Sequence, residues 1–154
     1  QALQESLYQA GCKSCVVTPF PCGPFAETYS WRRALELFDS GHIVLFAGGT
    51  GSPFFTTDSN GALRACEIEA DAMLKATKVD GVYNKDPKKH SDAIKYETLT
   101  YARILSEQLG IMDATAAALL MESAIPTIVF NIFERGNLWK ALSERNTGTF
   151  INNG

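Results

Sequence analysis

The amino-acid sequence predicts an α/β protein with a mainly parallel sheet that helices cover on both faces. Short apolar runs bounded by glycine or proline, such as residues 42–47 and 127–131, have the character of buried strands. Stretches with apolar residues at helical spacing lie between these runs. Strands that alternate with helices along a chain are typical of parallel α/β sheets.

The amino-terminal part is expected to hold a helix, a strand, a loop and a second helix, at residues 1–10, 16–18, 19–24 and 31–40. Ser30 is the expected N-cap of the second helix and Gly41 ends it. Trp31 opens the apolar stripe of that helix and is expected in the core. The helix at residues 1–10 has no N-cap and no preceding strand, so we expect a fold that is incomplete at its amino terminus.

The remaining helices are expected at residues 59–70, 101–109, 114–123 and 137–144. The remaining strands are expected at residues 71–77, 96–100, 127–131 and 148–151. Asp113 is the expected N-cap of the helix that follows it, and Asp80-Gly81 is a turn signal. Because no repeat or linker interrupts this pattern, we expect residues 1–154 to form a single domain.

Composition excludes several classes of protein. The chain has 154 residues and a formal net charge of −3, which argues against a basic surface for nucleic acid. No apolar run approaches the ~20 residues that a membrane span needs. The first residues have no signal-peptide character, so we expect a cytoplasmic protein without a membrane partner.

Residues 42–59 carry the strongest functional signal. An apolar run leads into Gly48, Gly49 and Gly51, and the chain then enters a helix. A glycine-rich loop before a helix N-terminus can hold an anion, because unpaired N–H groups and the positive end of the helix face it. The loop lacks the third glycine of a Rossmann fingerprint, where Phe54 stands, and it lacks the lysine of a P-loop.

Residues 49–58 read Gly-Thr-Gly-Ser-Pro-Phe-Phe-Thr-Thr-Asp. This segment resembles the nucleoside-monophosphate loop of bacterial-type UMP kinases (uridylate kinases) in the amino acid kinase family, with Ser52 where Asn is usual. The resemblance implies a three-layer α/β/α sandwich like that of the amino acid kinases. It also implies that UMP contacts the loop residues Thr50, Gly51, Ser52, Pro53, Phe54, Phe55, Thr56 and Thr57.

A second segment, Lys-Ala-Thr-Lys-Val-Asp-Gly-Val-Tyr-Asn-Lys-Asp-Pro at residues 75–87, resembles the ATP segment of the same kinases. The resemblance implies that Thr77, Tyr83 and Asp86 contact ATP. A strand that ends in a loop with Thr, Tyr and Asp is also a common binding edge without any resemblance. The alternative is a solvated hairpin.

Asp58 and Asp71 are the candidate catalytic residues. Asp58 lies where the loop meets the helix, and it either caps the helix or helps to position Mg²⁺ or the acceptor phosphate. Asp71 is expected to open a strand and to face the same crevice, and the resemblance suggests that it orients catalytic lysines. The alternative for Asp71 is a turn residue at the end of a strand. We expect no metal site built by the protein alone.

The resemblance extends from about residue 1 to residue 152 and corresponds to the carboxyl-terminal part of the kinases. It implies phosphoryl transfer from ATP to UMP with Mg²⁺, in pyrimidine nucleotide biosynthesis, by a homohexamer that GTP and UTP regulate. The kinases carry a Lys-x-Ser-Gly loop in their amino-terminal part. Its lysine has no counterpart in these residues, so we expect the chain alone to be inactive.

Three alternatives stay open. One is another kinase of the same family, acting on an amino acid or a carbamate. A second is a non-catalytic nucleotide- or oxyanion-binding module of the same fold, as in molybdate or tungstate storage proteins. The third is a redox protein that uses the Cys-x-x-Cys pair Cys12 and Cys15.

Overall fold

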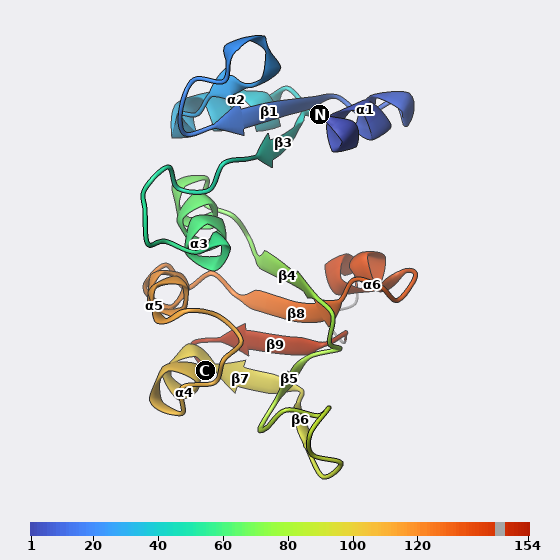
Figure 1. Ribbon diagram of the computed structural model, residues 1–154, viewed down its shortest axis with the longest axis vertical. Helices are drawn as coiled ribbons and strands as arrows, with labels where there is room; N and C mark the ends of the chain where they lie inside the picture. Colours follow the sequence, from blue (N-terminus) through green and yellow to red (C-terminus); the bar gives the residue numbers. More distant parts are fainter. Residues whose placement is uncertain (144–146) are drawn as a thin grey trace. The chain divides into compact units, whose positions relative to one another are not determined.

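The computed structural model describes residues 1–143 and 147–154. Two compact units make up the chain, Gln1–Asn60 and Gly61–Gly154 (Figure 1). The single domain expected over residues 1–154 stays a prediction. None of the helices within the described ranges is long and apolar enough to cross a membrane.

Unit 1 contains a three-stranded parallel sheet in the order β2-β1-β3. Its elements are α1 (Ala2–Gln9), β1 (Ser14–Thr18), the 3₁₀ turn η1 (Gly23–Phe25), β2 (Glu27–Thr28), α2 (Trp31–Asp39) and β3 (Ile43–Phe46). The Ser30 hydroxyl accepts the Arg33 N–H, which confirms the predicted cap. Two expectations of burial were wrong. Trp31 is 47% exposed, and β3 is only partly buried because it lies at the edge of its sheet.

Unit 2 contains a four-stranded sheet in the order β4-β8-β9-β7 and a separate hairpin, β5-β6. Helix α3 (Thr57–Glu67) begins in unit 1 and continues into unit 2. The other elements are β4 (Met73–Thr77), β5 (Val82–Tyr83), β6 (Lys95–Tyr96), β7 (Thr98–Thr100), α4 (Tyr101–Ser106), α5 (Ala114–Glu122), β8 (Thr127–Asn131), α6 (Asn137–Ser143) and β9 (Thr149–Asn152). Of the strand pairs described in the four-stranded sheet, only β8–β9 is antiparallel.

Strand β8 gives unit 2 its three layers. Successive side chains of a strand point to opposite faces, and four of the five residues of β8 are buried. Val129 packs in the cluster that includes residues of α4 and α5, whereas Ile128 and Phe130 pack with Ala141 of α6. Figure 1 shows α6 on one face of this sheet and α4 and α5 on the other. The expected covering of both faces is therefore confirmed in unit 2.

Most predicted elements are present with shifted ends. β8 has its predicted bounds, and Asp113 accepts the Ala116 N–H as the predicted cap of α5. Helix α4 stops at Ser106 instead of residue 109, and β4 starts at Met73 instead of residue 71. The sequence pattern did not reveal β2 or the start of β6. The predicted last helix reached residue 144, which lies outside the described residues.

The approach to β9 requires glycine at position 148. Gly148 has φ +81°, and a Cβ there would lie 1.9 Å from the Val129 carbonyl oxygen. We expect Gly148→Ala to lower the free energy of unfolding by at least about 3 kcal/mol, because the clash adds to the cost of a left-handed backbone. Urea denaturation followed by circular dichroism measures this change.

Gly136→Ala is the matched control for Gly148→Ala. Gly136 has φ +89°, and a Cβ added there would meet no atom of the described residues within 4 Å, so this variant tests the backbone cost alone. That cost should be about 1 kcal/mol. Equal losses for the two variants would contradict the packing argument.

Candidate functional site

The glycine-rich loop between β3 and α3 has an unusual backbone. Gly48, Gly49 and Gly51 have φ values of +83°, +66° and +78°, and Phe54 has φ +70°. Left-handed residues turn the chain sharply and leave backbone N–H groups directed outward, as in anion-binding nests. Gly51 is also required for space, since a Cβ there would lie 2.8 Å from the Pro19 Cβ.

Phe54 combines backbone strain with complete exposure. A left-handed conformation costs a non-glycine residue on the order of 1–3 kcal/mol and is concentrated at functional sites. The Phe54 side chain is fully exposed at 102%, and that of Phe55 is 55% exposed. Neither ring gains core packing that offsets this strain within the chain. The loop therefore presents two aromatic rings to the outside, which is the behaviour of a contact surface.

Thr56 caps helix α3. Its Oγ1 accepts the N–H groups of Asp58 (3.1 Å) and Ser59 (3.2 Å). Thr57 is the first helical residue, and Asp58 lies half-buried in the first turn. The capping role that the sequence offered for Asp58 therefore belongs to Thr56.

The predicted UMP residues form one continuous surface in unit 1. Thr50 is half-buried, and its Oγ1 accepts the Ser52 N–H at 3.1 Å, whereas residues 51–57 are exposed. The exposed loop residues 51–57 lead directly into a helix N-terminus, and backbone N–H groups, hydroxyls and a positive dipole end can meet in one place in such a segment. This arrangement can hold an anion of the size of a phosphate group.

The predicted ATP residues lie in unit 2, around the end of β4 and the β5-β6 hairpin. Thr77 ends β4, and its hydroxyl donates to the Val79 carbonyl (2.7 Å). The buried Thr149 hydroxyl of β9 accepts the Val82 N–H (2.8 Å) and donates to the Tyr96 carbonyl. One side chain of the sheet thus fixes both strands of the hairpin.

Tyr83 is held by a neighbouring carboxylate. Its hydroxyl donates to Asp80 Oδ1 at 2.6 Å, and Lys95 Nζ lies 3.1 Å from Asp80 Oδ2. The hydrogen bond to Asp80, together with partial burial and the negative charge, raises the pKa of Tyr83 to about 12. Burial opposes ionisation of Asp80, but the bonds from Tyr83 and Lys95 outweigh it and hold the pKa of Asp80 below its usual value.

A hollow of about 420 Å³ lies beside this hairpin. One wall is formed by residues around β5 and the other by the segment 107–111. The lining residues are Val79, Gly81, Val82, Tyr83, Asn84, Lys85, Asp86, Pro87, Glu107, Gln108, Leu109, Gly110 and Ile111. Tyr83 and Asp86 are therefore brought to one cavity, and Thr77 lies two positions before its first lining residue. The wall at 107–111 was missed, because the sequence pattern continued the helix to residue 109.

Asp71 is not close to Thr77, the predicted ATP residue on β4. It lies in an exposed bend before β4, whereas Thr77 is at the other end of the same strand. Five residues of β-strand span roughly 16 Å. The expectation that Asp71 opens the strand is wrong by two residues, because β4 begins at Met73. The catalytic role that the resemblance suggests for Asp71 stays a prediction. Its position fits the alternative of a turn residue.

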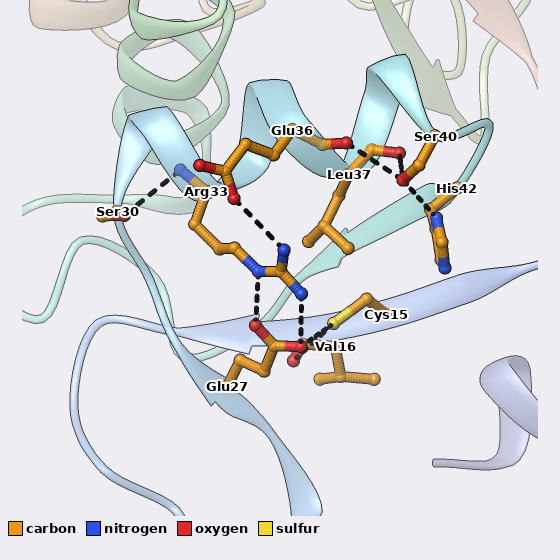
Figure 2. A network of polar contacts seen from close by, with 9 residues as sticks. All are labelled: Cys15, Val16, Glu27, Ser30, Arg33, Glu36, Leu37, Ser40 and His42. Atoms are coloured by element: carbon orange, nitrogen blue, oxygen red, sulfur yellow. Dashed lines mark hydrogen bonds and ion pairs between the residues drawn. The ribbon is translucent and has the colours of Figure 1, made fainter.

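The Cys-x-x-Cys pair was the basis of the redox alternative, and Figure 2 shows the surroundings of Cys15. Its Sγ donates to Glu27 Oε1 at 3.3 Å, and Arg33 binds both oxygens of the same carboxylate, at 2.8 and 3.2 Å (Figure 2). Burial raises the pKa of the Cys15 thiol, and the bond to Glu27 and its charge raise it further. Since the thiolate is the reactive form, Cys15 is a poor nucleophile.

Metal binding was considered for the same side chains. Across residues 1–143 and 147–154, no three His, Cys, Asp or Glu side chains gather into a group that could hold a metal ion. All four cysteines are free thiols.

The fold is α/β, and the loop between β3 and α3 belongs to a strand–loop–helix unit of the kind that can bind anions. Comparison with known proteins gives the family. A sequence model of the amino acid kinase family matches residues 1–131. The chain belongs to the amino acid kinase family.

Individual relatives agree with this assignment. The uridylate kinase of Protochlamydia amoebophila (strain UWE25) is 46% identical over 156 residues, which cover 99% of this chain and 62% of the relative. The structure of UMP kinase from Bacillus anthracis matches with a TM-score of 0.95 and 36% identity, over 98% of this chain and 63% of that one. UMP kinase from Ureaplasma parvum matches with a TM-score of 0.93 and 34% identity, over 98% and 65%.

The chain spans about three-fifths of the length of these relatives. Its α/β architecture with mainly parallel sheets is that of the amino acid kinase fold.

The Cys15 environment predicts slow alkylation. We expect iodoacetamide at pH 8 to modify Cys15 faster in Glu27→Gln than in the unmodified chain, because loss of the carboxylate lowers the thiol pKa. Peptide mapping by mass spectrometry gives the rate at Cys15. Glu36→Gln is the control, since it removes another Arg33 partner and leaves Glu27 in place. Equal rates in Glu27→Gln and the unmodified chain would contradict this account.

Proposed function

We propose that this chain is the carboxyl-terminal part of a UMP kinase, which transfers a phosphoryl group from ATP to UMP and yields UDP and ADP. The observation that carries the proposal is the strained loop at residues 48–56, which leads into a helix capped by Thr56. The similarity to relatives named uridylate kinase and UMP kinase supports it.

The loop is the proposed site for UMP. The backbone N–H groups of Thr50, Gly51, Phe54 and Phe55 and the hydroxyls of Thr56 and Thr57 would bind the monophosphate. Phe54 and Phe55 offer exposed apolar surface for the rest of the nucleotide. Phosphoryl transfer depends on positioning and on neutralising charge rather than on a covalent catalyst, and a pre-formed loop of donors supplies positioning.

The hollow beside the β5-β6 hairpin is the proposed site for ATP. Tyr83 offers a ring for contact with the base, and Asp86 offers a carboxylate for ribose or base donors. Thr77 stands at the carboxyl end of β4, where ligands of parallel sheets commonly bind.

Mg²⁺ fits this scheme as the partner of a nucleotide. Such an ion usually binds one or two carboxylates together with phosphates and water. Asp58 supplies one carboxylate in the first turn after the loop. When bound, the ion neutralises phosphate charge during transfer. Asp71 is a less suitable catalytic candidate, because it lies at the opposite end of β4 from Thr77.

Turnover should require the further segment that the relatives contain. We expect the chain alone to bind UMP and ATP but to show no turnover in the range of about 1–100 s⁻¹ that is typical of kinases. A fusion that places the amino-terminal part of the Protochlamydia amoebophila uridylate kinase before residue 1 should restore it. Nucleotide binding is measured by NMR and turnover by ADP release.

Each outcome of that comparison has a defined meaning. Binding of UMP and ATP with no turnover in the fusion would favour a non-catalytic nucleotide-binding module. Binding of neither nucleotide to the chain, with an inactive fusion, would defeat the proposal. Transfer to an amino acid or a carbamate instead of UMP would assign another member of the family.

Substitutions at Asp58 and Thr56 should distinguish an effect on kcat from an effect on the free energy of unfolding. In the fusion, Asp58→Asn should reduce kcat on the order of 100-fold, because one carboxylate that would hold Mg²⁺ is lost. Thr56→Ala should instead lower the free energy of unfolding by about 1 kcal/mol through loss of the cap, and Thr56→Ser should restore it. Parallel kcat and urea measurements test both. A stability loss in Asp58→Asn as large as its loss of activity would defeat the catalytic role.

A further inference from the structure

We propose that Asp80 is a positioning residue for the hollow assigned to ATP. It acts by fixing the Tyr83 ring and the Lys95 side chain. This inference rests on the proposed function, because it assigns a nucleotide to the hollow that Tyr83 lines. Asp80 itself is not among the lining residues. Its effect on a ligand would therefore pass through the residues that it holds.

Asp80 uses both carboxylate oxygens. Oδ1 accepts the Tyr83 hydroxyl at 2.6 Å, and Oδ2 accepts the Lys95 ammonium at 3.1 Å. Tyr83 is on β5 and Lys95 is its antiparallel partner on β6. The Asp80 carboxylate therefore links β5 and β6 through side chains, in addition to the backbone pairing of the two strands.

The connection is anchored at both ends. Val82, next to Tyr83, donates its N–H to the buried Thr149 hydroxyl. Tyr96, next to Lys95, lies under the Arg103 guanidinium at 4.6 Å, and Arg103 Nε donates to Glu107 at 2.7 Å. Glu107 lines the opposite wall of the hollow. The hairpin wall and the 107–111 wall are thus linked through adjacent residues of β6.

This geometry limits what Tyr83 can offer a nucleotide. Its hydroxyl proton is committed to Asp80, and the raised pKa of the phenol agrees with a strong bond there. The ring is left as a fixed apolar surface instead of a hydrogen-bond donor. A ring held before binding does not lose rotational freedom when the ligand arrives, so the contact is more favourable.

The first measurement examines the Tyr83–Asp80 bond without any nucleotide. Tyrosine labelled with ¹³C at Cζ reports phenol ionisation by NMR, and Tyr83→Phe identifies the Tyr83 signal among the five tyrosines. At pH 10.5 the Tyr83 phenol should stay mostly protonated in the unmodified chain. In Asp80→Asn its pKa should fall toward the ordinary value of about 10. A phenol that titrates alike in both proteins would overturn the inference.

The second measurement is the Kd of Mg²⁺-ATP for the same proteins, from amide shifts of residues 107–111. Asp80→Asn should raise Kd by about 3- to 10-fold, the value of one well-placed aromatic contact. The matched control is Asp92→Asn, which removes the Lys85–Asp92 pair of the same hairpin, and it should change Kd by less than about 2-fold.

A double variant decides whether Asp80 acts through Tyr83. Asp80→Asn removes the charge of the acceptor and Tyr83→Phe removes the donor of the same bond, so the double variant should bind no more weakly than the weaker of the two single variants. Additive losses, or an unchanged Kd in Asp80→Asn, would overturn the positioning role. If the unmodified chain binds UMP but no Mg²⁺-ATP at all, the ATP half of the proposed function fails, and the inference fails with it. The titration of Tyr83 separates these cases, because it does not involve nucleotide.

Discussion

The hydroxyl of Thr149 is the interaction on which the hollow in unit 2 depends. This side chain is completely buried, and it satisfies one N–H of β5 and one carbonyl of β6 at the same time. A buried hydroxyl that lost either partner would leave a polar group unpaired, at a cost of about 1–3 kcal/mol. Gly81 makes this approach possible, since a Cβ there would lie 2.6 Å from Thr149 Oγ1. The hairpin is therefore held at a fixed place on the sheet, and the hollow beside it has one firm wall.

The candidate surfaces of unit 1 and unit 2 are each held in place by different means. In unit 2 the hairpin is held by side-chain bonds, from Thr149 to the backbone and from Asp80 to Tyr83 and Lys95. In unit 1 the loop is shaped by its backbone, with three glycines and Phe54 in left-handed conformations. Backbone donors suit a phosphate, which all nucleotides share, whereas a fixed ring and a carboxylate suit the parts in which nucleotides differ.

The sequence predicted the features that depend on residues close together along the chain. The bounds of β8 follow from an apolar, β-branched run after Pro126, and the caps at Ser30 and Asp113 follow from residue type and spacing. The glycine-rich loop could likewise be located from its glycines and the helix behind it. The wall at 107–111, the Thr149 bonds and the place of Asp71 could not be predicted. These depend on which residues meet after folding, and Val82 and Thr149 are 67 positions apart.

The charged side chains around the hollow are paired with one another. Three of its cations already have acidic partners: Lys85 with Asp92, Lys95 with Asp80, and Arg103 with Glu107. Phosphoryl transfer requires positive charge at the transferring group. If Lys95 left Asp80 to meet a phosphate, the side-chain link from β5 to β6 through Asp80 would be lost at the moment of binding. The neutralising cation is better supplied from outside this hairpin, by an ion such as Mg²⁺ that arrives with the nucleotide. The hairpin is thereby suited to holding a ligand in position, because its own lysines already serve to hold the hairpin together.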